Sequence, residues 1–324
     1  MNAEKETLVV AESSPTLITL APKKHMGMRT KNGIGSTVIY VILVLMSVIW
    51  LFPFVCIFLQ SFEINRNSEL INPGSIFPVQ WGWDNYKNLF DPNGEFFKDF
   101  YVMNLDINFN RWLLNTFIVS LATAALQTVI VLCMSYTLSR LRFKGRKFLM
   151  KFMLILGMFP GMLTMIILYR VLADLGLTQQ NSIPGLILVY VASSGMGYYI
   201  SKGFFDTIPK SLDEAARVDG ATRAQVLFKV ILPLSKPIVI YTILTAFMGP
   251  WGDFVFAAYV AFNNKDGMNV AVGLQNLVSG TTNIVDKYRV FCAGGVIIAI
   301  PITLLFLLLQ KYYVEGVTGG AVKG

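Results

Sequence analysis

The sequence predicts an all-α integral membrane protein with six transmembrane helices, and three observations lead to this fold class. Hydrophobic residues make up 54% of the 324-residue chain and charged residues only 14%, whereas soluble globular domains carry about 25% charged residues. Charge-free stretches recur along the chain at close to the ~20 residues that a helix needs to cross a bilayer. Basic residues gather in alternate loops, as they do in multi-pass membrane proteins.

Composition excludes several other classes. The single His argues against a metalloenzyme or His-based catalysis, so we expect no catalytic residue and no metal site. Cys56, Cys133 and Cys292 fall within predicted spans and lack the C-x-x-C spacing of a zinc site. No cluster of His, Asp or Glu marks a membrane surface, which disfavours a membrane enzyme. The net charge of +8 belongs mostly to loops beside the membrane, so we expect no nucleic-acid partner.

The spans follow from the charge-free stretches. The first stretch is about twice the ~7–15 residues of a secretory signal sequence and no small-residue cleavage site follows it, so it counts as a span. The fifth continues past Asp253, because the chain is again uncharged up to Asn264. The charge-free stretches cover residues 32–62, 112–139, 152–169, 175–201, 237–252 and 290–310. We predict helices at about 36–60, 112–138, 148–171, 184–201, 237–261 and 289–311.

Orientation follows from the loop charges. The loop between the second and third spans carries six bases and no acid, and bases also precede the first span and fill the loop 202–236. The loop 61–111 has seven acids against four bases. Because cytoplasmic loops are enriched in Lys and Arg, we expect a multi-pass protein of a bacterial cell membrane with both termini in the cytoplasm.

Two segments outside the spans are polar. Residues 1–35 form an N-terminal extension that we place in the cytoplasm. The outer loop 61–111 is punctuated by Pro and Gly turns and carries Trp81, Trp83 and Tyr86. These aromatic side chains are consistent either with an interfacial belt or with a docking surface for an external partner.

The loop 202–236 is too long for a minimal connector and is predicted to hold two short helices. Ser211 to Glu214 has the pattern of a capping box at the start of the first helix, and Gly220 is expected to end it. Thr222 is expected to cap a second helix over residues 223–230. Pro233 and Pro237 are then expected to end that helix and to start the next span.

Small residues in this loop could admit a partner. Ala215 and Ala216 leave a flat surface where another protein could approach closely, so the paired helices suit a socket for a cytoplasmic partner. A passive amphipathic loop is the alternative.

Asp253 is an acid inside a predicted span, and such residues are functional-site hypotheses by default. Gly249 and Pro250 precede it and should kink the helix. A kinked span with an inward carboxylate suits the wall or gate of a pathway. The alternative is a structural ion pair, for which Arg170 is a candidate.

Several motifs resemble those of one transporter family. Glu214-Ala215-Ala216, three residues, Gly220, nine residues and then 230–233 (VILP) resembles the EAA motif of importer-type ABC transporter permeases, with Val230 where Ile is commoner. The segments 213–222 (DEAARVDGAT), 251–254 (WGDF) and 270–275 (VAVGLQ) resemble the carbohydrate-uptake subclass. The end of the chain, 314–324, is similar to the tail of maltose-type permease subunits. The resemblance covers about residues 36–324.

This resemblance implies a type I ABC importer permease fold with coupling helices between the fourth and fifth spans. The domains would be the extension 1–35, the permease domain 36–313 with its coupling loop 202–236, and a cytoplasmic tail 314–324. The implied ATPase-coupling residues are Glu214, Ala215, Ala216, Gly220, Leu232 and Pro233. The implied ATPase contacts of the tail are Gly319, Gly320, Lys323 and Gly324, although a frayed chain end is the alternative. The candidates for the translocation path or gate are Gly249, Pro250, Trp251, Asp253 and Phe254.

The implied function is uptake of a carbohydrate, with maltose or maltodextrin as cargo. The chain has no Walker A sequence, so we expect no cofactor here, and ATP and Mg on a partner ATPase. The implied partners are a second permease subunit, two copies of the cytoplasmic ATPase, an extracytoplasmic sugar-binding protein and membrane lipid. Another sugar or oligosaccharide is the alternative cargo. An ion-coupled secondary transporter is a different class of alternative, although no internal repeat favours it.

Overall fold

The computed structural model describes residues 28–64, 76–91, 108–262, 264–279 and 284–321, and these residues are almost entirely helical. The one β feature among them is an isolated bridge between Glu63 and Trp81. The chain divides into two units, Met1–Pro53 and Phe54–Gly324. The described helices are α1 (Met28–Gln60), α2 (Asp84–Phe90), α4 (Phe109–Arg140), α5 (Arg146–Leu156), α6 (Gly161–Asp174), η2 (Gln179–Asn181), α7 (Ser182–Ala192), α8 (Gly195–Thr207), α9 (Lys210–Val218), α10 (Arg223–Gln225), η3 (Val226–Ile231), α11 (Leu232–Leu234), α12 (Lys236–Gly252), α13 (Val255–Val260), η4 (Lys265–Gly267), α14 (Val270–Val278) and α15 (Ile284–Ala321).

The first unit contains most of α1. Between Ser36 and Pro53 every side chain is exposed, and most of these side chains are large and apolar, such as Ile49 and Trp50. A helix that is apolar all round belongs in a protein core or in a lipid bilayer. Within the described part of this unit no other element covers these side chains, so α1 has the surface of a membrane-spanning helix.

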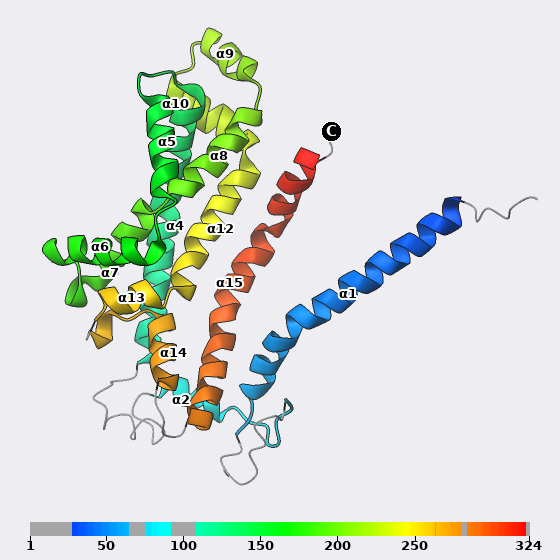
Figure 1. Ribbon diagram of the computed structural model, residues 1–324, viewed down its shortest axis with the longest axis vertical. Helices are drawn as coiled ribbons and strands as arrows, with labels where there is room; N and C mark the ends of the chain where they lie inside the picture. Colours follow the sequence, from blue (N-terminus) through cyan, green and yellow to red (C-terminus); the bar gives the residue numbers. More distant parts are fainter. Residues whose placement is uncertain (1–27, 65–75, 92–107, 263, 280–283, 322–324) are drawn as a thin grey trace, which may run out of the picture. The chain divides into compact units, whose positions relative to one another are not determined.

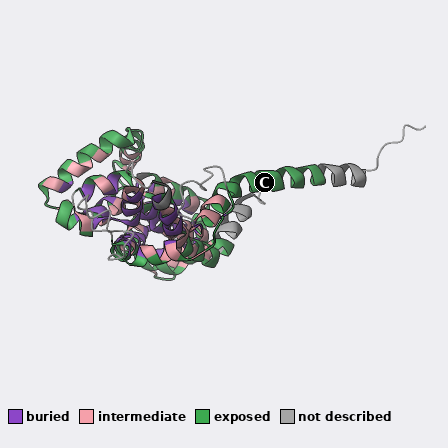
Figure 2. Cartoon of the chain, turned by 90° about the horizontal axis from the view of Figure 1, so that it is seen from below, coloured by how far each residue is buried: buried purple, intermediate pink, exposed green. Residues whose placement is uncertain are grey.

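The second unit is organised around α4. Helices α7, α8, α12 and α14 all pack against it, and α15 packs against α12 and α14. Figure 1 shows α9 and α10 at one end of these helices, with α2 and α14 at the other. Buried residues gather in the interior of this unit (Figure 2), with Phe109 and Trp112 of α4 among the most deeply buried.

Among the described residues, four helical segments are able to cross a membrane by length and composition. They are Ser36–Gln60, Phe109–Arg140, Gln179–Thr207 and Lys287–Lys311. Two bent pairs bring the possible total to six. Residues Arg146–Leu156 and Gly161–Asp174 meet at 103°, and residues Arg223–Leu234 and Lys236–Gly252 meet at 88°.

Three predicted spans differ from the observed helices. The helix predicted at 184–201 is divided into α7, which ends at Ala192, and α8, which starts at Gly195. The single helix predicted at 148–171 is wrong, because α5 stops at Leu156 and α6 starts after Pro160. Proline has no N–H to donate to the preceding turn and clashes with it, so a helix readily breaks there. The single helix predicted at 237–261 is also wrong, because it is interrupted between Gly252 and Val255.

Hydrogen bonds attach the segment before α14 to α4. The Asn115 side-chain amide donates to the carbonyls of Asp266 at 2.6 Å and Met268 at 2.9 Å. The Val270 amide donates to Thr116 Oγ1 at 2.8 Å. Since these side chains are buried, the bonds satisfy backbone groups that water cannot reach.

Close packing at Gly273 gives a stability prediction. A Cβ at this position would lie 2.1 Å from the Trp112 ring, so Gly273→Ala must displace a buried indole. We expect an overpacking cost of about 1–3 kcal/mol, seen as a lower thermal unfolding midpoint in detergent. Gly203→Ala in α8 is the matched control, since nothing lies within 4 Å of its added Cβ. Equal midpoints for both variants would contradict the packing.

Candidate functional site

The first candidate site is the α9–α11 loop, whose first helix ends as expected at Gly220. Its φ of +85° is a left-handed conformation that glycine adopts without strain. The Gly220 amide donates to the Arg217 carbonyl at 3.1 Å and the Ala221 amide to the Ala216 carbonyl at 2.9 Å. This pair of bonds is a Schellman motif, and it reverses the chain between α9 and α10.

The predicted caps of the two helices had different outcomes. The capping box at Ser211 is wrong, because α9 already starts at Lys210, after Pro209, with no side-chain cap. The fixed φ of Pro209 starts the helix one residue too early for the Ser211 hydroxyl to cap it. The cap at Thr222 is confirmed, and it forms a full capping box with Gln225.

The second predicted helix, over 223–230, is a composite. It starts at Arg223 as expected, but it widens into the π-helical η3 and then narrows again in α11. Pro233 lies inside α11, where the prediction had it ending the helix. Pro237 lies in the first turn of α12, as predicted, where its missing N–H costs nothing.

An apolar cluster fixes this loop on the bundle. Its buried members come from α4, α8, the Ile208 turn, η3 and α12. Ala216 and Leu232 are half-buried and pack against it. Glu214, Ala215 and Pro233 are exposed. The buried residues of the cluster are Leu132, Tyr136, Phe205, Ile208, Val226, Leu227, Ile231 and Ile238.

A largely buried ion pair, which sequence reasoning missed, ties α9 to the end of α4. Arg140 Nε lies 3.0 Å from Asp213 Oδ2, and the two side chains are 4% and 14% exposed. The Arg140 guanidinium also donates to the Ile208 carbonyl at 2.9 Å. Burial, with a smaller effect of Glu214, raises the pKa of Asp213, while Arg140 and Lys210 oppose that rise. In the sequence, Arg140 is just one of six loop bases, and nothing local marks Asp213 as its partner.

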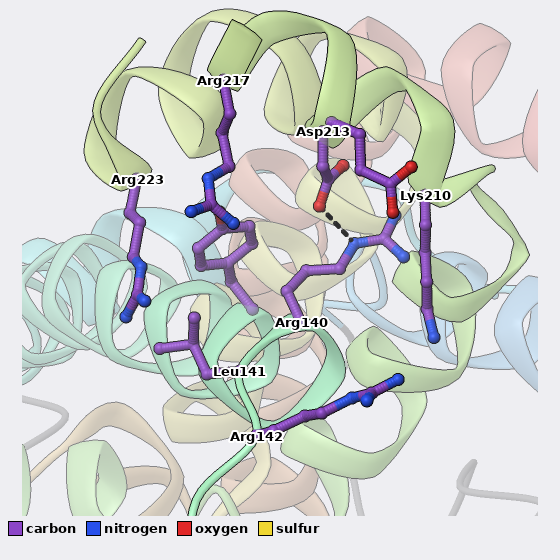
Figure 3. Close-up of a pocket in the computed structure, with 9 residues that line it drawn as sticks. Arg140, Leu141, Arg142, Lys210, Asp213, Arg217 and Arg223 are labelled. Carbon is purple, nitrogen blue, oxygen red and sulfur yellow. Dashed lines mark ion pairs between the residues drawn. The ribbon is translucent and has the colours of Figure 1, made fainter. Parts of the chain in front are cut away.

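The ion pair borders a cavity of about 480 Å³ between the end of α4 and the α9–α10 turn. Figure 3 shows side chains from both sides of the cavity, with Arg140 and Asp213 directed toward one another. Five basic and two acidic side chains line it, which leaves a formal surplus of three positive charges. The lining residues are Tyr136, Arg140, Leu141, Arg142, Lys210, Asp213, Glu214, Arg217 and Arg223.

The second candidate site surrounds Asp253, at the break between α12 and α13. Asp253 Oδ1 accepts the Phe256 amide at 3.1 Å, and Oδ2 accepts the Tyr190 hydroxyl at 2.5 Å. The pairing with Arg170 that the sequence left open is wrong, because Arg170 instead lies 3.7 Å from Asp174 on an exposed face. The partner is Tyr190 of α7, an uncharged residue that a search for opposite charge does not find.

The other predicted path residues lie next to Asp253, on either side of the break between α12 and α13. Helix α12 continues through Gly249 and Pro250 to Gly252, so the helix ends two residues later than the predicted kink. The Asn269 side-chain Nδ2 donates to the carbonyls of Pro250 at 3.2 Å and Asp253 at 2.8 Å. Trp251 is 3% exposed and Phe254 39%. Asp253 is therefore hydrogen-bonded through both oxygens, and its role in a path stays a prediction.

Other predicted sites lie partly outside the described residues. Gly319 and Gly320 lie in α15, which remains helical to Ala321, so the tail predicted at 314–324 is largely a continuation of the last helix. Lys323, Gly324, residues 1–27 and most of the loop 61–111 are not described.

The described outer-loop aromatics form a ring cluster around Phe62. The ring centroids of Trp81, Trp83 and Tyr86 lie 5.9, 5.0 and 5.3 Å from that of Phe62. Trp81 and Trp83 remain 57% and 62% exposed. An exposed aromatic cluster is compatible with an interfacial belt and with a docking surface for an external partner, so both interpretations stay predictions.

Comparison with known proteins places the chain among transport proteins. Residues 129–319 match the family model for the binding-protein-dependent transport system inner membrane component. The galactooligosaccharides transport system permease protein GanQ of Bacillus subtilis (strain 168) is 35% identical, over 88% of this chain and 94% of its own length. The maltodextrin transport system permease protein MalD of Streptococcus pneumoniae (strain ATCC BAA-255 / R6) is 33% identical, over 91% and 98%.

One maltose-system relative and one solved structure extend the comparison. The maltose/maltodextrin transport system permease protein MalG of Vibrio vulnificus (strain YJ016) is 36% identical, over 66% of this chain and 72% of its own length. A chain of a bacterial ABC transporter involved in the import of the acidic polysaccharide alginate superposes with a TM-score of 0.70. It is 20% identical, and the match covers 89% of this chain and 99% of that one. At this identity the likeness shows a shared fold.

Proposed function

The chain belongs to the binding-protein-dependent transport system inner membrane component family, and from this membership we propose that it is a permease subunit of an ATP-driven ABC importer for carbohydrate. The observation that carries the proposal is the α9–α11 loop. Its apolar side is fixed to the bundle, and Glu214 and Ala215 are exposed to a partner. Among relatives at 33–36% identity are maltodextrin and maltose/maltodextrin permeases, so maltodextrin is the proposed cargo.

The loop is proposed to receive the motion of a separate ATPase. A short helix held at its base by the Arg140–Asp213 ion pair and closed by the Gly220 turn transmits a push to α4 and α12 as a rigid body. Two ATPase copies would bind ATP and Mg, and this chain would hydrolyse nothing. Transport then proceeds by alternating access, with a second permease subunit as the opposing half.

The remaining assignments are proposals of the same kind. The loop end of the bundle faces the cytoplasm, as the positive charge of the loops supports. An extracytoplasmic sugar-binding protein delivers the cargo to the opposite end; a solved ABC importer of alginate was crystallised with its ligand-bound periplasmic protein. Gly319, Gly320, Lys323 and Gly324 are proposed to contact the ATPase. The residues proposed to border the path are Gly249, Pro250, Trp251, Asp253 and Phe254.

Uptake of labelled maltotriose tests this function in cells lacking the gene, with and without its restoration. We expect restored uptake that longer maltodextrins compete away and that ATP depletion abolishes. Galactooligosaccharide is included as a competitor, because GanQ is 35% identical to this chain. Competition by galactooligosaccharide alone would show that the cargo is not maltodextrin, and it would leave the assignment as an ABC importer permease unchanged. Uptake that survives ATP depletion on an ion gradient would instead indicate a secondary transporter.

A further inference from the structure

The cavity between α4 and the α9–α10 turn holds more positive charge than its own acids neutralise. Asp213 is paired with Arg140. Arg142, Arg217 and Arg223 also line the cavity, and no ion pair joins them to an acid in the part of the chain that the structure describes. Figure 3 shows Arg217 and Arg223 extending from the loop toward the end of α4. Like charges brought together without counter-charges repel one another, and a bound anion would relieve that repulsion.

Arg140 supplies a second, independent observation. Its side chain is 4% exposed, and while Nη2 donates to the Ile208 carbonyl, its buried Nη1 has no hydrogen-bond partner. A buried donor left unsatisfied is costly, the more so on a charged group. The Arg140 guanidinium lines the cavity and therefore retains an N–H group that could donate a hydrogen bond to an oxygen of a ligand.

The chemistry of this lining matches a phosphate group. The planar fork of guanidinium donors binds phosphate oxygens in pairs. Inorganic phosphate and phosphate monoesters carry a charge of about −1.5 to −2 near neutral pH, which offsets about half or more of the formal surplus. A phosphodiester headgroup such as that of phosphatidylglycerol offsets one charge, as a carboxylate does, and its phosphate oxygens still match the guanidinium fork. The volume of about 480 Å³ leaves room for the group to which the phosphate is attached, and Tyr136 and Leu141 provide apolar wall.

The position of the cavity is consistent with two sources of phosphate. Arg140 is the last residue of the candidate span Phe109–Arg140, so the cavity lies at the depth of phospholipid headgroups, where basic pockets bind anionic lipid. The lining residues Arg217 and Arg223 of the loop are exposed, so a free phosphate could also enter. We propose that this cavity is an oxyanion site that binds a phosphate group, from an anionic lipid headgroup or from solution. The site does not depend on which sugar is transported.

The test uses the purified full-length chain in neutral detergent and follows its thermal unfolding midpoint. One arm titrates inorganic phosphate at constant ionic strength against chloride. The other titrates short-chain phosphatidylglycerol against phosphatidylcholine. We expect the midpoint to rise in at least one arm, and the arm that responds identifies the source of the phosphate.

A paired variant makes the test specific to the cavity. Arg217→Gln with Arg223→Gln removes two exposed guanidinium groups and leaves the Arg140–Asp213 pair intact. We expect the apparent Kd to weaken about tenfold or more, as the loss of charge-assisted hydrogen bonds implies. Lys229→Gln is the control, because Lys229 is an exposed base of the same loop outside the cavity lining. Three results would each overturn the proposal. They are an equal shift of the unfolding midpoint with chloride or phosphatidylcholine, no shift of the midpoint in either arm, and an undiminished shift in the double variant.

Discussion

Glu214→Ala and Gly220→Val are each expected to abolish sugar uptake while the protein is still inserted into the membrane. Glu214 is exposed and makes no ion pair with another described residue, so its removal costs the isolated chain little stability. The loss of the Glu214 carboxylate is instead expected to weaken the proposed contact with the ATPase. Gly220 has a φ of +85°, where a β-branched side chain is strained by about 1–2 kcal/mol. The strain would reorient α9 with respect to α10.

Uptake and membrane abundance are measured together, along with sugar-stimulated ATPase activity of the assembled complex. Two matched variants separate coupling from folding. Asp219→Ala alters an exposed acid in the same turn, and Gly220→Asn places a residue that tolerates the left-handed conformation; both should transport normally. If Glu214→Ala transports at the wild-type rate, the coupling role of this loop is wrong.

Asp253→Ala is expected to disrupt the α12–α13 break and to reduce uptake strongly. The change removes the acceptor of the Phe256 amide, a capping bond worth about 0.5–2 kcal/mol. It also leaves the half-buried Tyr190 hydroxyl without its acceptor, at a cost of about 1–3 kcal/mol. Asp253→Asn keeps an oxygen for the cap and an amide opposite Tyr190, so its effect on stability should be small.

Comparing stability with uptake distinguishes a structural role from a path role. Tyr190→Phe removes one of the two bonds, and its combination with Asp253→Ala should be less than additive in unfolding midpoint because the two residues are in contact. If Asp253→Asn keeps wild-type stability but loses transport, the carboxylate charge itself acts in the path. If it transports normally, Asp253 serves to hold the break. Additive midpoints would contradict the Tyr190–Asp253 bond.

The sequence alone determined the membrane class and the family, because both rest on local patterns. Charge-free stretches and the spacing from Glu214 to Pro233 can be read without knowing what lies nearby in space. The Gly220 turn and the Thr222 cap were also predictable, since each depends on backbone geometry within a few residues. The capping box at Ser211 failed because the neighbouring Pro209 competed for the same helix start.

Only the tertiary structure decided which distant residues meet. Arg140 pairs with Asp213 and Tyr190 with Asp253 because α4 packs beside α8 and α7 beside α13, and a single sequence contains no signal for either pairing. The same packing determines that Ala216 contacts the apolar cluster while Ala215 is exposed. Hydropathy measures how readily a segment transfers into an apolar phase, and it contains almost no information on where the helix bends or which neighbours its side chains face. It therefore located the helices but not where they bend, nor the cationic cavity that forms where the end of α4 meets the α9–α10 turn.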